Sequence, residues 1–265
     1  MKTRELFEAF FYPLIRLNEI VRTSDELGEL VVYEFQDCRV LTFGSIFEQS
    51  RMRLHQPLQL EHEYTQAMLL PLLFQQPLQH ITLLGLGAGV LASYLFHAIE
   101  SATLTVVEWR EAVIDIAFEY FALPVDERLD VIHDDAGQFI AAAAPESTDW
   151  ILSDLFTASD MSAVQLQADF YRDCFTALRV DGWLVLNFHG QPSIECPAIR
   201  SLCAQFPAVF MVTVASGNRV VMASKNSVSW PTKVQLFSEN FLSETFPVGL
   251  SETLTRLSTR VVSLR

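Results

Sequence analysis

The sequence predicts an α/β protein in which a mainly parallel sheet, covered by helices on both faces, follows a small antiparallel β-module. Three observations predict this fold. After Pro77, strand-like apolar runs alternate with helical patterns to about residue 225, as the crossovers of a parallel sheet require. The first of these runs ends in closely spaced glycines. The residues before it form short β-rich runs separated by turn residues.

The composition is typical of a soluble globular protein. Half of the 265 residues are hydrophobic, yet no apolar run approaches the roughly 20 residues that a membrane-spanning helix needs. The first eight residues include acids where a signal peptide has basic and apolar regions, so we expect a cytoplasmic protein with no membrane partner. The four cysteines are scattered without a CxxC pair, which favours reduced thiols and no metal site.

The net charge of −14 limits the classes of partner. Nucleic-acid binding depends on clustered Lys and Arg, which this chain lacks, so no nucleic-acid partner is expected. A positively charged ligand is compatible with such a field. We therefore expect a small-molecule substrate.

The first 60 residues are expected to form an N-terminal helix and the β-module. Apolar residues in the first 25 positions recur with a spacing close to 3.6, which predicts an amphipathic helix or a partner-contacting arm. They are Leu6, Phe7, Phe10, Phe11, Leu14, Ile15 and Leu17. Three β-rich runs follow, punctuated by Gln36-Asp37 and Gly44-Ser45, as hairpin turns would be. These runs are Leu30–Phe35, Cys38–Phe43 and Ile46–Phe47.

Residues 61–228 are expected to form a Rossmann-like nucleoside-binding domain, and residues 229–265 a C-terminal extension that packs on it or on a neighbouring subunit. A helical stretch over 61–74 precedes the alternation. The predicted strands are 80–84, 103–108, 129–133, 150–154, 183–188, 209–214 and 219–223. The predicted helices between them are 90–99, 111–121, 163–178 and 198–205.

The glycine-rich turn after the first strand narrows the class of ligand. Gly85, Gly87 and Gly89 are spaced G-x-G-x-G, whereas a dinucleotide fingerprint is G-x-G-x-x-G. Class I methyltransferases and their relatives use such a turn to hold S-adenosylmethionine. Glu108 ends the next strand, where a carboxylate accepts hydrogen bonds from two ribose hydroxyls. A purely structural glycine turn is the alternative.

The order of motifs resembles that of the spermidine synthases, or polyamine aminopropyltransferases. Their motifs are G-G-G-D-G, a strand ending in Glu, a G-D-[AG] step and a D-S-S-D-P loop. Here the matching segments are Gly85–Gly89, Val106–Glu108, Asp134–Ala136 and Ser153–Thr157. Further matches are Ser45–Gln49, Phe170–Tyr171, Asp181–Val185 and Val221–Asn226. Pro57–Leu60 with Tyr64 and Met68 looks more like a divergent, spermidine-synthase-like member.

This resemblance implies a Rossmann-like class I methyltransferase fold that takes S-adenosylmethionine or its decarboxylated form as co-substrate, with a polyamine as acceptor. It also implies a homodimer. Glu108 would hold the ribose, and Gln49 and Tyr64 match positions that line the nucleoside site.

Around the adenine ring, the resemblance implies that Asp135 accepts a hydrogen bond from the amino group while the Ala136 backbone meets the ring edge. Trp109 is positioned to pack on the adenine face. Two alternatives stay open: Trp109 could belong to the core, and Asp135 could merely cap the helix that starts at Ala136. Asp154, at the end of the fourth strand, would face the sulfonium or an amine and is the catalytic candidate.

Two positions depart from the family pattern. The carboxylate of G-G-G-D-G, which the resemblance assigns to the aminopropyl ammonium, is replaced by Ala88. The second Asp of the D-S-S-D loop, which the resemblance assigns to deprotonation of the amine, falls on Thr157. Asp154, Asp160 or His189 could compensate.

Three hypotheses follow from these motifs and departures. The first is an aminopropyltransferase that uses Asp154 as its remaining carboxylate. The second is an S-adenosylmethionine-dependent methyltransferase that acts on an unidentified small molecule. Leu83 counts against it, because many such enzymes have an acidic residue at this position. The third is a non-catalytic nucleoside-binding relative, which the lost carboxylates allow.

Overall fold

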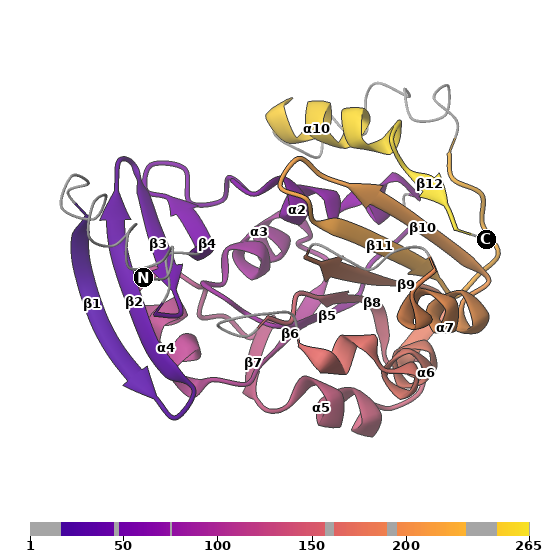
Figure 1. Ribbon diagram of the computed structural model, residues 1–265, viewed down its shortest axis with the longest axis horizontal. Coiled ribbons are helices and arrows are strands. Elements are labelled where there is room, and N and C mark those ends of the chain that lie inside the picture. The colour runs from indigo at the N-terminus through magenta and orange to yellow at the C-terminus, as the bar shows by residue number, and fades with distance from the viewer. Residues whose placement is uncertain are drawn as a thin grey trace, which may run out of the picture.

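The computed structural model consists of two sheets, with the smaller one packed beside the larger (Figure 1). The structure describes residues 17–44, 48–74, 76–156, 162–189, 195–231 and 248–264. The smaller sheet is antiparallel, and its four strands follow one another in chain order. They are β1 (Asn18–Asp25), β2 (Gly28–Phe35), β3 (Cys38–Thr42) and β4 (Glu48–Arg53). The predicted β-module is therefore confirmed.

The helical spacing of the first 25 residues does not make a helix of its last part. Residues 18–25 form β1, which pairs with β2 along its length. The turn between them explains this, because Asp25 Oδ1 accepts a 2.9 Å hydrogen bond from the Leu27 amide and Gly28 has a φ of +114°. The structure of residues 18–25 is therefore set by their pairing with β2 and not by the helical spacing of the apolar residues. Residues 1–16, with most of the predicted arm, lie outside the described residues, as do Ser45, Ile46 and Phe47.

The larger sheet has the strand order β12-β10-β11-β9-β8-β5-β6-β7. The strands β5 to β9 pair in parallel, and β11, β10 and β12 complete the sheet in antiparallel fashion. Their bounds are β5 (His80–Leu84), β6 (Thr103–Glu108), β7 (Leu129–His133), β8 (Thr148–Ser153), β9 (Leu178–Phe188), β10 (Ala208–Thr213), β11 (Arg219–Ser224) and β12 (Val262–Ser263). The mainly parallel sheet is confirmed.

The helices connect these strands and are shorter than predicted at two places. They are α2 (Glu63–Ala67), α3 (Val90–Ala98), α4 (Glu111–Tyr120), α5 (Ala136–Ala142), α6 (Ala168–Ala177), α7 (Pro197–Gln205) and α10 (Val248–Ser258), with 3₁₀ turns at Leu70–Phe74 and Ala163–Leu166. Among the described residues, no helix has the length and apolar character to cross a membrane.

The two interrupted helices have identifiable causes. In the 61–74 segment, Pro71 lacks an amide donor and disfavours α-helical geometry in the residue before it. In the 163–178 segment, Gln167 is extended, with a ψ of 138°. The buried Gln165 side chain accepts from Ser153 and donates to the Asn187 carbonyl, which holds the 3₁₀ turn against the sheet.

Helices cover both faces of the large sheet. Along β9, Trp183 and Val185 belong to a core shared with α2, α3 and α10, whereas Leu184, Leu186 and Phe188 belong to a core shared with α5, α6 and α7. In Figure 1, α5, α6 and α7 accordingly lie together on one side of the sheet, opposite α10. The alternation of side chains along a strand makes this two-sided burial possible.

The β-module packs against the carboxyl ends of the parallel strands. A third core cluster joins it to the main domain and consists of Leu30, Val32, Leu41, Met52, Ala88, Val113, Ile116 and Phe121. Beside this cluster, the buried Arg110 guanidinium forms a 2.7 Å ion pair with Asp25 and donates to the Gly28 carbonyl. The module is therefore fixed where it can form a wall over the glycine turn.

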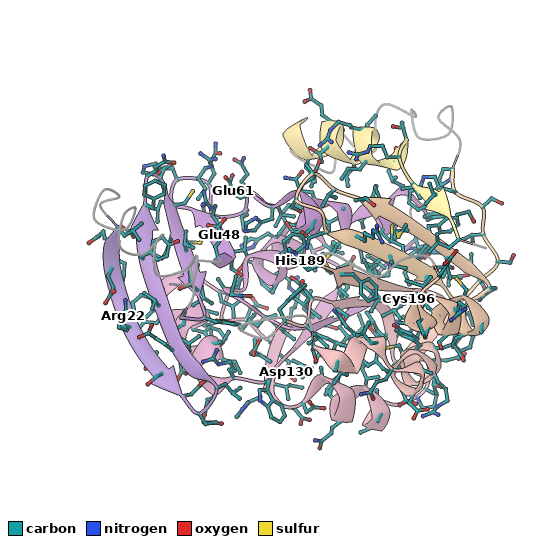
Figure 2. The ribbon with its side chains drawn as sticks, in the orientation of Figure 1. Arg22, Glu48, Glu61, Asp130, His189 and Cys196 are labelled. Atoms are coloured by element: carbon teal, nitrogen blue, oxygen red, sulfur yellow. The ribbon has the colours of Figure 1, made fainter. Side chains whose placement is uncertain are left out.

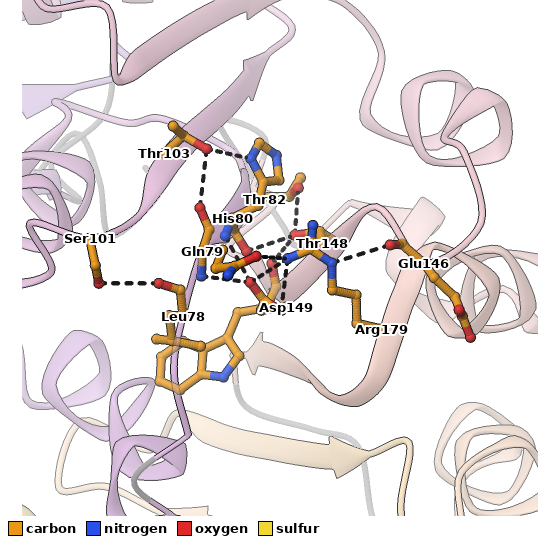
Figure 3. Close-up of polar contacts among 11 residues, drawn as sticks. Leu78, Gln79, His80, Thr82, Ser101, Thr103, Glu146, Thr148, Asp149 and Arg179 are labelled. Atoms are coloured by element: carbon orange, nitrogen blue, oxygen red, sulfur yellow. Dashed lines mark hydrogen bonds and ion pairs between the residues drawn. The ribbon is translucent and has the colours of Figure 1, made fainter.

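A polar network closes the opposite edge of the sheet, where the strands begin (Figure 3). Asp149 Oδ2 accepts hydrogen bonds from the backbone amides of Gln79 (2.7 Å) and His80 (2.8 Å). The same carboxylate pairs with Arg179 at 3.0 Å. It thereby joins the start of β5 to β8 and β9, on the edge remote from the glycine turn.

We predict that Asp149→Ala lowers the free energy of unfolding by about 2 kcal/mol, because two backbone donors and one guanidinium lose a charged acceptor. Urea unfolding at constant pH measures this change. Asp169→Ala removes a carboxylate from the exposed Asp169–Arg172 pair and is the control, with an unchanged midpoint expected. Equal midpoints for wild type and Asp149→Ala would contradict the prediction.

Candidate functional site

A pocket of about 910 Å³ lies where the carboxyl ends of β5, β6, β7 and β8 meet the β-module. Open α/β sheets bind ligands at this edge. All but one of the residues predicted for the site line the pocket: Gln49, Tyr64, Gly85, Gly87, Glu108, Trp109, Asp135, Ala136 and Asp154. Gly89 is the exception, because it is the N-cap residue of α3 and packs towards Leu123 and Leu86.

The glycine turn is held by close backbone approaches. Gly85 has a φ of +91°, and a Cβ there would lie 2.4 Å from the Asp154 carbonyl oxygen. Gly87 has a φ of +53°, and a Cβ there would lie 2.5 Å from Ser50 Oγ. A side chain at Gly85 would therefore clash with the backbone that leaves β8, and one at Gly87 would displace the Ser50 hydroxyl and strain the turn.

Glu108 ends β6 and is nearly buried. Its Oε2 accepts a 2.9 Å hydrogen bond from the Leu86 amide in the glycine turn, and its Oε1 accepts one of 2.9 Å from the Arg110 amide. Burial raises the pKa of this carboxyl, while these two amides and the Arg110 charge oppose the rise. Each oxygen retains acceptor capacity for a ligand hydroxyl in the pocket.

Asp135, Ala136 and Trp109 surround one end of the pocket. Asp135 Oδ1 accepts a 2.8 Å hydrogen bond from the Gln138 amide, so Asp135 is the N-cap of α5 as well as a pocket residue. Trp109 is 52% exposed and does not belong to the core. A large aromatic ring left open at a pocket rim can stack on a planar ligand.

Asp154 follows β8 and is held by neutral donors. Asn187 Nδ2 donates to Asp154 Oδ1 at 2.7 Å, and the Tyr64 hydroxyl donates to the same carboxylate. Burial raises the pKa of Asp154 to about 6, and these two hydrogen bonds limit the rise. Burial and the Asp154 charge raise the pKa of Tyr64 well above its usual value, so Tyr64 remains a donor. Asp154 can therefore exchange a proton near neutral pH.

Tyr64 was among the predicted site residues, but the sequence patterns did not identify Asn187 and Asn218, which also support Asp154. Asn187 is buried, and its Oδ1 accepts a 3.0 Å hydrogen bond from Asn218 Nδ2, which fixes the amide orientation. Asn218 in turn accepts from Ser216. A polar residue near the end of a buried strand was the available signal for Asn187. Nothing in the local pattern connects it to Asn218.

The positions that depart from the family pattern, and the residues that could compensate for them, lie in different surroundings. Ala88 is fully buried in the cluster between the β-module and α4, so its side chain does not line the pocket. His189 is exposed and does line it. Thr157 and Asp160 lie outside the described residues.

The part of the chain that the structure describes contains no cluster of metal-binding side chains. No group of three His, Cys, Asp or Glu side chains there could hold a metal ion. Two of the four cysteines, Cys38 and Cys174, are buried.

Comparison with known proteins identifies the family. No family model matches the chain. It is 33% identical over 220 residues to a polyamine aminopropyltransferase of Neisseria meningitidis serogroup A, covering 82% of each chain. The chain belongs to the polyamine aminopropyltransferase family. The resemblance inferred from the motif order is therefore confirmed.

Solved structures agree with the fold of a polyamine aminopropyltransferase. A probable spermidine synthase from Corynebacterium glutamicum superposes with a TM-score of 0.72 at 21% identity, covering 82% of this chain and 84% of that one. Human methyltransferase-like protein 13, solved in complex with SAH, superposes with a TM-score of 0.58 at 18% identity, covering 75% and 93%. At these identities the likeness concerns the fold alone, and it confirms the predicted class I methyltransferase-like architecture.

The raised pKa of Asp154 predicts a pH-dependent stability. In the unfolded chain this carboxyl ionises near its ordinary value of 3.8, whereas the folded protein retains the proton up to about 6. The contribution of Asp154 to the free energy of unfolding should therefore fall as pH rises through this window and then become level. Asp154→Asn removes the titration, so its stability relative to wild type should increase between about pH 4 and pH 7 by roughly 2 kcal/mol.

Urea unfolding of both proteins at the two pH values measures this difference. Asp169→Asn changes an exposed carboxylate outside the pocket and is the matched control. A stability difference between wild type and Asp154→Asn that is the same at both pH values would contradict the burial argument.

Proposed function

We propose that this member of the polyamine aminopropyltransferase family transfers an aminopropyl group from decarboxylated S-adenosylmethionine to a polyamine. The observation that carries the proposal is Asp154. This carboxylate lines a pocket at the carboxyl-end edge of the parallel strands together with Glu108, Trp109, Asn187 and Asn218. The neutral Asn187 amide donates to it and is itself held by Asn218.

The nucleoside of the co-substrate would occupy the end lined by Glu108, Trp109, Asp135 and Ala136. Glu108 would accept from the two ribose hydroxyls while its present bonds to the turn keep it oriented. Trp109 would cover one face of the adenine, and Asp135 and Ala136 would meet its edge. Gly85 and Gly87 would let the chain approach the sugar, and Gln49 and Tyr64 would complete the wall.

The reaction would be a displacement at the carbon attached to the sulfonium. The amine nitrogen forms the new N–C bond, the C–S bond breaks, and sulfur takes the bond's electron pair to leave as neutral methylthioadenosine. One proton must leave the attacking nitrogen, and Asp154 would accept it. The Tyr64 hydroxyl and the Asn187 amide keep this carboxylate in place. A cationic donor and a cationic acceptor are both compatible with the net charge of −14.

The proposal extends to the organisation of the chain. Residues 1–60 would form the N-terminal unit, 61–228 the nucleoside-binding domain and 229–265 the extension, whose Leu250, Leu254 and Leu257 side chains are buried in the main core. A cytoplasmic homodimer, with neither nucleic acid nor membrane as partner, is the assembly that family membership suggests.

An assay with decarboxylated S-adenosylmethionine and 1,4-diaminobutane tests the function. We expect methylthioadenosine and the extended polyamine in equal amounts by mass spectrometry. Asp154→Ala should lose turnover by a factor of about 100 or more, as for a lost general base, but should still bind methylthioadenosine. Methyl transfer from S-adenosylmethionine would favour the methyltransferase hypothesis. Binding of none of these nucleosides in a calorimetric titration would refute both enzyme hypotheses.

Glu108→Gln tests the ribose contact. The amide keeps the size of the side chain but loses the charge, so methylthioadenosine binding should weaken by about 1.5–3 kcal/mol, as for a lost hydrogen bond to a charged group. Calorimetric titration measures the affinity. Glu111→Gln, an exposed acid on the first turn of α4, is the control. If both variants bind like wild type, Glu108 does not contact the ligand.

A further inference from the structure

One carboxylate of the pocket, Glu48, comes from the β-module and has no part in the proposed reaction. Figure 2 shows Glu48 and Glu61 beside β4 and His189 near the larger sheet, and all three line the pocket. The pairing of β3 with β4 passes from Leu41–Ser50 to Thr42–Glu48, so Gln49 is left without a partner. This bulge breaks the alternation of the strand, and Glu48, Gln49, Ser50 and Arg51 all line the pocket.

The Glu48 carboxylate is oriented on one side and available on the other. Arg51 donates to Oε2 through its Nη2 at 2.6 Å and its Nε at 3.2 Å. The other oxygen, Oε1, lies 4.0 Å from His62 Nε2, which is beyond hydrogen-bonding distance. Burial lowers the pKa of His62, so this ring is neutral near pH 7 and does not compete for the carboxylate as a cation.

Glu48 lines the same pocket as the glycine turn and the catalytic candidate, and it is linked to both. Two residues along β4, Ser50 Oγ accepts a 3.0 Å hydrogen bond from the Ala88 amide in the turn. On the other side, the charge of Glu48 contributes to the raised pKa of Tyr64, whose hydroxyl donates to Asp154. A donor whose nucleoside lies beside Glu108 and whose chain reaches Asp154 would occupy the pocket that Glu48 also lines.

We propose that Glu48 binds the primary ammonium at the end of the donor's aminopropyl chain. The inference rests on the proposed function and names how the donor is selected. The Ala88 side chain cannot supply this negative charge, because it is an apolar group buried in the core beneath the β-module. Glu48 delivers the charge from β4 instead, with Arg51 holding the carboxylate in position.

This contact also distinguishes two related donors. Decarboxylated S-adenosylmethionine ends in an ammonium alone, whereas S-adenosylmethionine has a carboxylate on the same carbon. A fixed carboxylate at Glu48 attracts the first and repels the added charge of the second. Methylthioadenosine has the nucleoside without either group and therefore reports on the rest of the site.

Glu48→Gln tests the inference by calorimetric titration with the three nucleosides. We expect affinity for decarboxylated S-adenosylmethionine to fall about ten-fold or more, as for a lost charged hydrogen bond. Methylthioadenosine should bind as it does to wild type. The preference for the decarboxylated donor over S-adenosylmethionine should decrease accordingly.

Glu34→Gln is the matched control. Glu34 pairs with Arg39 in the same β-module, the two side chains are 24% and 25% exposed, and neither lines the pocket. This variant should keep all three affinities. An unchanged affinity of Glu48→Gln for the decarboxylated donor, or an equal loss for methylthioadenosine, would overturn the inference. Wild type that binds none of the nucleosides would instead overturn the proposed function.

Discussion

The site depends on one carboxylate, Glu108, that is bonded to two backbone amides. By accepting from Leu86 and Arg110, it joins the glycine turn after β5 to the chain that leaves β6. A buried carboxylate without donors would be costly, and these amides offset part of that cost. The same bonds orient both oxygens towards the pocket. Arg110 then extends the constraint, because its amide holds Glu108 while its guanidinium holds Asp25 and the Gly28 carbonyl of the β-module. The nucleoside end and the wall above it are thus parts of one bonded unit.

The β-module is therefore part of the site. Its apolar residues share a core with α4 and Ala88, and Ser50 bonds to the turn itself. The strand has a bulge at Gln49, and four consecutive residues of β4, from Glu48 to Arg51, line the pocket. Loss of the Arg110–Asp25 pair would leave a buried charge without its partner and would weaken the position of this wall. We therefore expect ligand affinity to depend on the docking of the module.

Sequence patterns predicted what depends on local chain geometry. The bounds of β5 and β6 follow from apolar runs buried on both faces, and those of the partly exposed β7 follow from a shorter apolar run. Glu108 and Asp154 follow from their places at or just after strand ends. The side-chain network around Asp154 could not be predicted, because Asn187, Asn218 and Tyr64 come from distant elements that only the folded sheet brings together. The apolar period at the N-terminus was misleading for residues 18–25, because pairing with β2 outweighed it. The packing of Ala88 against the β-module also depends on the docking of that module.

Asp154 has no positively charged partner in the chain, and this favours a positively charged substrate beside it. Its hydrogen-bond donors, Tyr64 and Asn187, are both neutral, so burial is not offset there by a cation of the chain. A carboxylate in this state has a raised pKa and is costly in its charged form. A bound sulfonium or ammonium supplies the missing positive charge, favours the ionised carboxylate and is itself held more tightly in return, since the two effects are one coupling free energy. Donor binding would thereby shift Asp154 towards the form that accepts a proton from the attacking amine.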